Sequence, residues 1–284
     1  MDVRLFCEYP PAFPIHYLEL SFRKPDVGLS KKDNSMSKRK NLGWLPDEFD
    51  ERDFVYKSKK TSAQFPSVVD HRKRYFRAWD QGDLGSCTAH AASAACMFLD
   101  VYDRDMPVVV PSRIFVYYAT RTLEGTKHSD SGATLRNTIK AIATWGYPPE
   151  DKWPYDIRKF TIRPPEEVIS LAAKERIKSY ERLGRDLDHF REVIAEGHPI
   201  ILGFAVYPSI YDRNVKKTGH IPVPKAGEKR EGGHAVLVCG YDDAKEALII
   251  RNSWGEDWGE EGYGYLPYRY IEEPKLSGDF WTIR

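Results

Sequence analysis

Three stretches of the chain carry apolar residues at the spacing of a buried or amphipathic helix. The first begins at or just before Cys87 and continues through an alanine-rich run without a helix breaker. The second covers about 133–145 and ends at Gly146, after which two prolines follow. The third covers about 186–196. Residues three or four apart share one face of a helix, so these stretches predict three helices in the first two-thirds of the chain.

Beyond this point the apolar pattern changes to short runs typical of β-strands. Gly, Pro or charged turns separate five such runs, at 199–206, 235–241, 247–251, 262–266 and 280–283. This punctuation is typical of antiparallel sheet. A helical first half followed by a β second half predicts an α+β fold with two lobes. A ligand site is expected where the lobes meet.

The amino-terminal region has a different character. Residues 1–22 are rich in proline and aromatic residues and show no helical period, and residues 23–41 form a polar, basic, serine-containing stretch. We interpret the second stretch as a mobile linker. We predict a division into an amino-terminal extension at 1–64 and a folded domain at 65–284.

Composition narrows the classes of partner. The 43 lysines and arginines nearly balance the 42 aspartates and glutamates, which argues against nucleic acid or an anionic membrane as the main partner. No apolar run approaches the roughly 20 residues that a membrane span needs. The first residues lack the features of a secretory signal. With only four cysteines and no paired short spacing, we expect reduced thiols, and hence a cytoplasmic protein or export by a route other than the general secretory one.

Cys87 is placed where a thiol becomes reactive. A cysteine at a helix amino terminus faces unpaired backbone N–H groups and the positive end of the helix dipole, and both favour the thiolate. Gly85 and Ser86 precede it and allow a close approach, so the N–H of Cys87 can point at a developing oxyanion. Gln81 lies six residues earlier and is a candidate second donor. Taken alone, a cysteine in an alanine-rich helix is more often a packing residue.

The second half of the chain supplies a base. His234 follows two glycines at the head of an apolar strand, and Asn252 comes 18 residues later within the sequence Asn-Ser-Trp-Gly. An asparagine that bonds one imidazole nitrogen fixes the tautomer of the ring. Trp254 is expected to cover that bond and exclude water.

Together these motifs resemble the papain family of cysteine peptidases. The order Gln81, Cys87, His234, Asn252 matches, and the histidine follows the cysteine by 147 residues, within the spacing typical of that family. The resemblance runs from about Phe65 to the carboxyl terminus. It implies a papain-like two-lobe fold, with a helical left lobe at about 87–180, an antiparallel, β-barrel-like right lobe at about 181–284, and residues 65–86 crossing between them. The active site is expected between the lobes, with peptide or protein substrates. The resemblance also implies a catalytic domain at 65–284 and makes the extension at 1–64 a candidate inhibitory prosegment. It also implies a role in substrate binding for four further residues, Ser131, Gly132, Gly233 and Trp254. No cofactor or metal is implied.

Three positions depart from the family pattern. Leu84 stands where a disulfide-bonded cysteine is common, Thr88 replaces the usual tryptophan after the nucleophile, and Ser131 replaces the first of two glycines in the substrate strand. Residues 1–64 are too short and too proline-rich for a typical family propeptide, and Gly43-Trp44-Leu45-Pro46-Asp47 resembles a segment of bacterial relatives. These departures affect the expected substrate preference more than the chemistry.

Three alternatives remain open at this stage. Cys87, His90, His234 and Cys239 would be the ligands of a zinc site, but they lack the paired short spacing of such sites. A non-catalytic binding protein with a papain-like fold is a second reading, because fold alone does not fix activity. An isopeptidase that keeps the same residues is the third.

One regulatory hypothesis follows from composition. Extended, proline-rich segments suit a peptidase cleft, so we expect residues 1–22 to lie in or across the cleft and restrain the enzyme. The alternative, an arm that only packs on the surface, is equally compatible with the composition.

Overall fold

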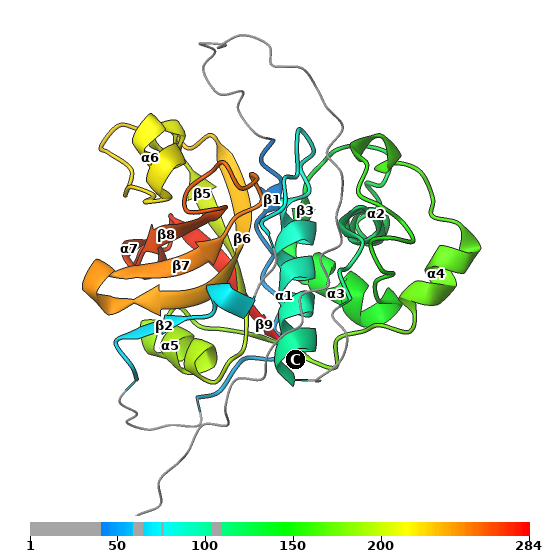
Figure 1. Cartoon of the computed structure of the whole chain (residues 1–284), viewed down its shortest axis with the longest axis horizontal. Helices are drawn as coiled ribbons and strands as arrows, with labels where there is room; N and C mark the ends of the chain where they lie inside the picture. The colour runs from blue at the N-terminus through cyan, green and yellow to red at the C-terminus, as the bar shows by residue number, and fades with distance from the viewer. Residues whose placement is uncertain (1–40, 59–64, 75–76, 104–108) are drawn as a thin grey trace, which may run out of the picture. The chain divides into compact units, whose positions relative to one another are not determined.

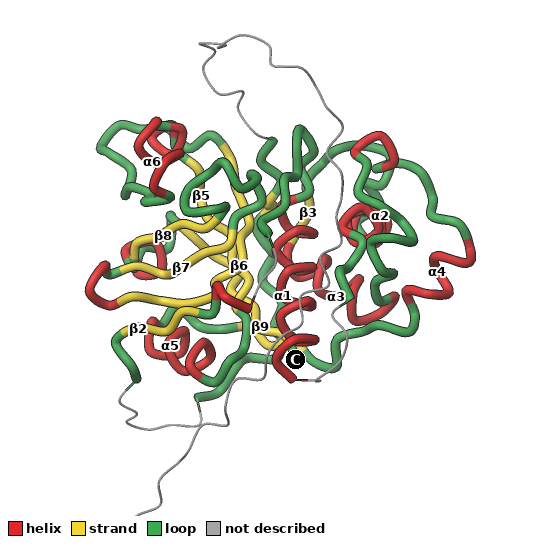
Figure 2. The backbone as a smooth tube through the Cα atoms, viewed as in Figure 1, coloured by secondary structure: helices red, strands yellow, loops and turns green. Residues whose placement is uncertain are grey.

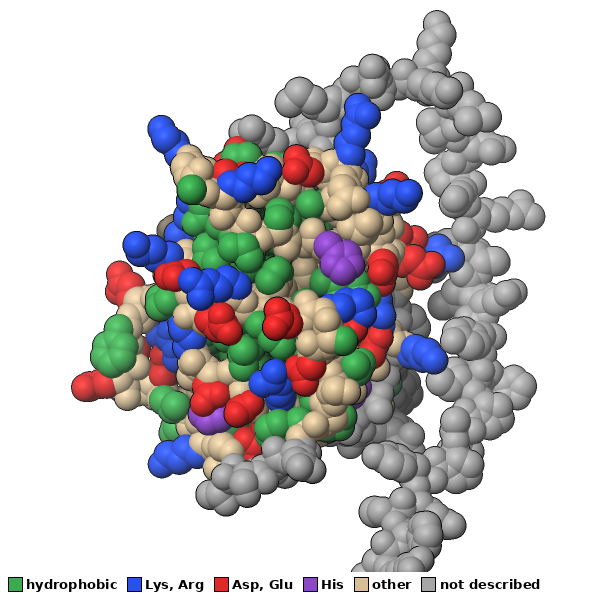
Figure 3. Space-filling model, turned by 90° about the vertical axis from the view of Figure 1, so that its left-hand side faces the viewer, with side chains coloured by type: hydrophobic (Ala, Val, Ile, Leu, Met, Phe, Trp, Pro, Cys, Tyr) green, Lys and Arg blue, Asp and Glu red, His purple; other side chains and the backbone are tan. Residues whose placement is uncertain are grey.

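The computed structural model describes residues 41–58, 65–74, 77–103 and 109–284 (Figure 1). The predicted arm at 1–22 and all but the last residue of the predicted linker lie outside these residues. No helix in the described ranges is both long enough and apolar enough to cross a membrane. On the face shown in Figure 3, acidic and basic side chains are interspersed rather than gathered by sign.

The three predicted helices are present, together with four that the apolar pattern did not reveal. The predicted ones are α1 at Cys87–Asp103, α3 at Leu135–Trp145 and α5 at Leu187–Ala195. The additional ones are α2 at Arg113–Leu123, α4 at Glu166–Ala172, α6 at Arg213–Thr218 and α7 at Arg269–Glu272. The second predicted helix begins two residues late, because Ala133 and Thr134 form the short strand β3 and the Thr134 hydroxyl caps the helix by accepting from the Asn137 N–H.

All five predicted strands are present. They are β5 at Ile200–Val206, β6 at Gly232–Asp242, β7 at Ala247–Arg251, β8 at Tyr263–Pro267 and β9 at Ser277–Ile283. Short strands β2 at Val68–Asp70 and β4 at Tyr180–Arg182 join the same sheet, whose order is β4-β9-β5-β6-β7-β8 with β2 paired to β6. The described pairings of this sheet are antiparallel, and they leave β4 and β8 at its two ends. A separate pair is formed by β1, at Trp44–Leu45, which runs parallel to β3.

Helix α1 lies between the sheet and helices α2 and α3 (Figures 1 and 2). Its alanines form one buried cluster with Ile201 of β5, Leu237 of β6 and Ile139 of α3. Small side chains on α1 allow the sheet to approach the helix closely, and the larger residues opposite fill the space between them. The amino terminus of α1 is thereby fixed next to the head of β6.

Strand register then brings two distant positions of the chain together. Phe204 of β5 lies opposite His234 of β6, and Leu237 of β6 lies opposite Arg251, the last residue of β7. Asn252 directly follows that strand. The register of β6 with β7, which the sequence alone does not specify, places the histidine and the asparagine side by side.

Gly146, at the end of α3, packs closely against the end of α4, and two glycine substitutions test that packing. Gly146 has φ of 78°, and a Cβ there would lie 1.9 Å from the Ala172 carbonyl oxygen. Gly125 has φ of 73° but nothing within 4 Å of its Cβ position. We expect Gly125→Ala to cost about 1 kcal/mol, for its positive φ alone. Gly146→Ala should cost about 2 kcal/mol more, both for the overlap and for a backbone of φ 78° and ψ −159°, which only glycine adopts readily. Urea unfolding midpoints measure both, and equal losses would contradict this account of the packing.

Candidate active site

Cys87 is the first residue of α1, and its side chain is fully buried. The loop before it is fixed by Asp130, whose carboxylate accepts from the Gly85 N–H at 3.0 Å. Backbone N–H groups of Ala235, Gly43 and Thr88 lie close enough to the Cys87 sulfur to lower the pKa of its thiol. Because Ala235 directly follows His234, this contact joins the start of α1 to the head of β6.

One ring nitrogen of His234 is hydrogen-bonded, whereas the other has no hydrogen-bond partner among the described residues. Its Nε2 lies 2.7 Å from Asn252 Oδ1, and that oxygen also accepts from the Ser253 N–H at 2.8 Å. The Trp254 ring lies over the imidazole with centroids 4.6 Å apart. The Nδ1 atom of His234 is buried and has no hydrogen-bond partner among the described residues. A buried, unpaired ring nitrogen in a polar site indicates a group that takes up its partner during function.

Gln81 is held in one orientation by both ends of its amide. Its Oε1 accepts from the Ser253 hydroxyl at 2.7 Å, and its Nε2 donates to the Leu84 carbonyl at 2.8 Å. The same Nε2 also donates to the carbonyl oxygen of Asn41 at 3.0 Å. The structure thus brings Gln81, Cys87, His234 and Asn252 into one region, and Asn41 presents a peptide carbonyl to it.

Residues 41–45 pass directly over this region. The Gly43 carbonyl accepts from the Ala133 N–H at 2.8 Å, as part of the pairing of β1 with β3. Backbone meets backbone here: a Cβ on Gly43 would lie 1.9 Å from the Gly85 oxygen, and one on Gly132 would lie 2.4 Å from the Gly43 oxygen. Only glycine permits so close an approach. The hypothesis that residues 1–22 lie in the cleft concerns residues outside the described ranges, whereas Asn41 and Gly43 contact Gln81, Gly85 and Gly132.

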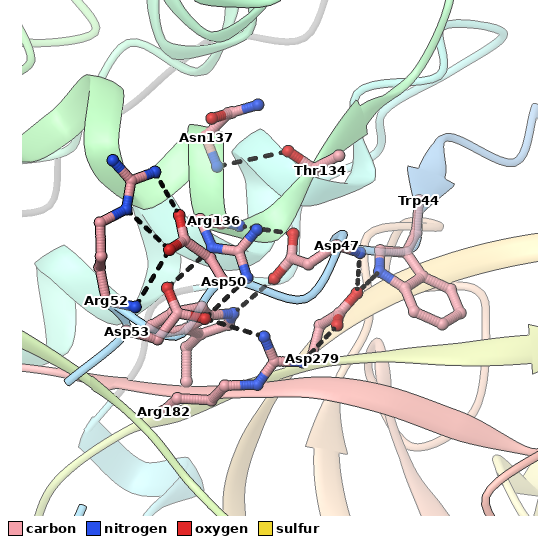
Figure 4. Close-up of polar contacts among 11 residues, drawn as sticks. Trp44, Asp47, Asp50, Arg52, Asp53, Thr134, Arg136, Asn137, Arg182 and Asp279 are labelled. Carbon is pink, nitrogen blue, oxygen red and sulfur yellow. Dashed lines mark hydrogen bonds and ion pairs between the residues drawn. The ribbon is translucent and has the colours of Figure 1, made fainter. Parts of the chain in front are cut away.

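Residues further along this segment are anchored by charge (Figure 4). Asp53 receives two hydrogen bonds from the Arg136 guanidinium, at 2.9 and 2.7 Å, and one from Arg182 at 3.0 Å. Asp47 accepts from the Arg136 N–H at 3.0 Å and from the Trp281 indole at 2.9 Å. We call residues 41–56 the cleft segment.

Burial shifts the pKa values of both titrating groups toward their neutral forms. It raises the pKa of the Cys87 thiol to about 11, against the effect of the nearby backbone N–H groups. It also lowers the pKa of His234 to about 4, against the effect of its bond to Asn252. At pH 7 both groups are therefore neutral in this structure.

The other residues singled out from the sequence have distinct places. Gly132 and Gly233 line the path of the cleft segment. The Ser131 hydroxyl bonds Thr126 Oγ1 at 2.9 Å and the Gly132 carbonyl at 3.0 Å, and so braces the loop. Asp130 was not predicted; it also accepts from the Tyr117 hydroxyl, which in turn accepts from the Gly132 N–H. Its position next to Ser131-Gly132 was the one available signal.

The residues of the zinc alternative do not converge. Nδ1 of His90 lies 3.0 Å from the Ser86 carbonyl, and Cys239 Sγ lies 3.6 Å from the Ile249 carbonyl, in a separate hydrophobic cluster. Within the described ranges, no group of three or more His, Cys, Asp or Glu side chains is placed to hold a metal ion. Cys87, Cys96 and Cys239 are all buried.

Comparison with known proteins agrees with this geometry. The sequence model described as "Papain family cysteine protease" matches residues 65–273. The chain belongs to the papain family. Among solved structures, this papain-family chain is similar to xylellain, a cysteine protease from Xylella fastidiosa, with 39% identity and a TM-score of 0.81 over 88% of this chain and 99% of that one.

Two further relatives define the range of the family likeness. An uncharacterised peptidase-like protein of Acanthamoeba polyphaga mimivirus is 35% identical over 86% of this chain and 87% of its own length. Procathepsin L 3 of the Tenebrio molitor larval midgut shares the fold, with a TM-score of 0.66 at 16% identity, over 86% of this chain and 75% of that one. The two-lobe papain-like fold predicted from the motifs is confirmed. The assignment to a bacterial branch stays a prediction.

Proposed function

We propose that this papain-family chain is a cysteine endopeptidase with Cys87 as nucleophile and His234 as acid and base. His234 takes the proton of the Cys87 thiol as the sulfur attacks a peptide carbonyl, and it gives that proton to the leaving amine as the C–N bond breaks and the thioester forms. Water, deprotonated by His234, then hydrolyses the thioester. The Gln81 Nε2 and the Cys87 N–H stabilise the oxyanion in both steps.

One observation carries this proposal. The bond from His234 Nε2 to Asn252 leaves Nδ1 buried, unpaired among the described residues, and one residue away from the amide that touches the Cys87 sulfur. A base held in one tautomer beside a thiol at a helix amino terminus is the arrangement that nucleophilic catalysis by cysteine needs.

We also propose that the chain is latent while the cleft segment is bound. The segment's own Asn41 carbonyl accepts from Gln81, the donor proposed for the oxyanion. Its Gly43 lies against the thiol, whose burial holds it in the unreactive protonated form. Residues 1–64 would then be an inhibitory prosegment, as the sequence predicts, with the cleft segment as its inhibitory part. Related solved structures include a ragweed pollen cysteine protease in its proform.

Labelling with a thiol-directed epoxysuccinyl inhibitor tests the proposed nucleophile. The test uses the full chain with Trp44→Ala and Asp53→Asn, because these changes weaken the binding of the cleft segment to the rest of the protein. We call this variant the released chain. Mass spectrometry should locate the label on Cys87 only, and a chelator should have no effect. In the unaltered chain at pH 7, labelling should be far slower and should rise as the pH approaches the thiol pKa of about 11.

Cys96 and Cys239 serve as internal controls, since both are also buried cysteines. Label on either of them instead of Cys87 would contradict the assignment. Absence of label in the released chain would favour the non-catalytic binding protein. An isopeptidase would be labelled at Cys87 but would cleave branched substrates in preference to linear peptides.

A further inference from the structure

Tyr155 lies in the loop that follows α3, and its hydroxyl contacts both segments that carry the proposed oxyanion donors. The hydroxyl oxygen lies 2.9 Å from the Gln81 carbonyl oxygen and 2.7 Å from Ser86 Oγ. Gln81 supplies one donor through its Nε2, and Ser86 directly precedes Cys87, whose N–H is the other. One hydroxyl from a distant part of the chain therefore joins the two donors of the proposed oxyanion hole.

The proton positions in this network follow from its acceptors. A carbonyl oxygen can only accept, so the single hydroxyl proton of Tyr155 goes to Gln81, and the Ser86 hydroxyl must donate to the Tyr155 oxygen. His90 Nδ1 lies 3.0 Å from the Ser86 carbonyl oxygen and carries its ring proton for the same reason. The network therefore runs in one direction, from His90 through Ser86 and Tyr155 to Gln81, with a donor and an acceptor at each step.

Tyr155 is fixed independently of these two bonds. Its N–H donates to Glu150 Oε1 at 2.8 Å, and Glu150 forms an ion pair with Arg113. The Arg113 guanidinium lies 4.9 Å from the centre of the Tyr155 ring, and the His90 ring meets that ring edge-on with centroids 4.8 Å apart. These contacts use the backbone and the ring of the tyrosine rather than its hydroxyl. Replacement by phenylalanine would thus keep the packing and remove only the two hydrogen bonds.

Gln81 depends on the Tyr155 bond because of its neighbour in the chain. Gly82 has φ of 61°, in the left-handed region, and glycine restricts the adjoining peptide group least of all residues. The Gln81 carbonyl belongs to the peptide group between these two residues, so the Tyr155 bond sets the orientation of that group. On the other side, the Gln81 N–H donates to the Ser253 carbonyl at 2.9 Å. Bonds from both sides therefore fix the backbone from which the Gln81 amide reaches the site.

Burial makes the bonds of this network costly to lose. Gln81 and Ser86 are fully buried, and a buried polar group left without its partner loses more free energy than an exposed one. We propose that Tyr155 is a positioning residue that keeps Gln81 Nε2 and the Cys87 N–H at the mutual spacing that an oxyanion requires. The inference rests on the proposed peptidase function and adds to it a residue that acts through the two donors.

Tyr155→Phe in the released chain tests the inference by kinetics. A misplaced donor weakens binding of the transition state and not of the substrate, so kcat should fall about tenfold while KM stays within about twofold. Alkylation of Cys87 by iodoacetamide is the comparison reaction, since the sulfur displaces iodide from a saturated carbon and no oxyanion forms. The alkylation rate should stay within about twofold of that of the released chain, with the same pH profile. A merely structural change would slow both reactions, and equal losses in the two would overturn the proposal.

A double variant shows whether Tyr155 acts through Gln81. In the released chain that also carries Gln81→Ala, Tyr155→Phe should lower kcat by less than about threefold, because the donor that it positions is already gone. The full loss in both backgrounds would overturn the proposal.

Ser86→Ala breaks the network on the Cys87 side. It should lower kcat while leaving alkylation by iodoacetamide unchanged, because the Tyr155 hydroxyl then lacks the donor that ties it to the start of α1. This variant carries the same test if Tyr155→Phe fails to fold, and an unchanged kcat would then overturn the proposal.

Tyr241→Phe is the matched control. Tyr241 is fully buried, and its hydroxyl donates to the Pro66 carbonyl at 2.8 Å, the same kind of bond at the opposite end of β6 from His234. This variant of the released chain should keep kcat within about twofold. An unchanged kcat in Tyr155→Phe, while the released chain is active and labelled at Cys87, would overturn this inference alone. A released chain that is neither labelled nor active would overturn the proposed function as well.

Discussion

Cys87→Ala and His234→Ala should each abolish peptide hydrolysis by the released chain. Loss of a nucleophile that works together with a base costs on the order of 10⁵–10⁶ in kcat, and removal of either partner costs almost as much as removal of both. Gln81→Ala should lose less, about 10²–10³, because one oxyanion donor remains at the Cys87 N–H. Asn252→Ala should keep measurable activity, since it only orients His234. Initial rates with a fluorogenic peptide give the order.

Matched variants guard this series against loss of folding. Cys239→Ala changes a buried thiol on the same strand as His234 and should remain within about threefold of the released chain. Circular dichroism and urea unfolding should show that all variants adopt the same folded state as the released chain. Full activity of Gln81→Ala or Asn252→Ala would remove that residue from the mechanism.

Release of the cleft segment should have the second largest effect, in the opposite direction. A buried aromatic side chain removes about 150–250 Å² from water, worth roughly 4 kcal/mol, and the indole adds its bond to Asp279. Trp44→Ala in the full chain should therefore raise hydrolysis of a small peptide by at least about 100-fold. Gly43→Ala should act in the same direction, because its Cβ would overlap the Gly85 oxygen.

Phe49 is the matched control for this prediction. It is an aromatic residue of the same segment but is 91% exposed, so Phe49→Ala should change the rate by less than about twofold. A larger effect of Phe49→Ala than of Trp44→Ala would place the inhibitory contact elsewhere. Equal rates for Trp44→Ala and the unaltered chain would remove the cleft segment's inhibitory role.

The sequence determined the parts of this protein that depend on local pattern. An alanine-rich run without a breaker gave α1 and its start at Cys87, and apolar runs between turns gave the five long strands. The family motifs are also local features of the sequence, and they predict the fold without reference to any tertiary contact. Helix α2 was not predicted, because its Ile-Phe-Val-Tyr-Tyr run has the β-branched and aromatic composition of a strand. Packing against α1 and α3 overrides that preference.

Only the tertiary structure decided what covers and shapes the site. Trp44 meets Asp279 across 235 positions of the chain, and Asp47 meets Trp281 across 234. Neither pair carries a periodic signal, because such contacts depend on how the strands and the cleft segment are arranged in space. The pKa values of Cys87 and His234 are of the same kind, since burial sets them. The sequence thus names the proposed reacting groups, while their access and ionisation arise from long-range packing that no local pattern records.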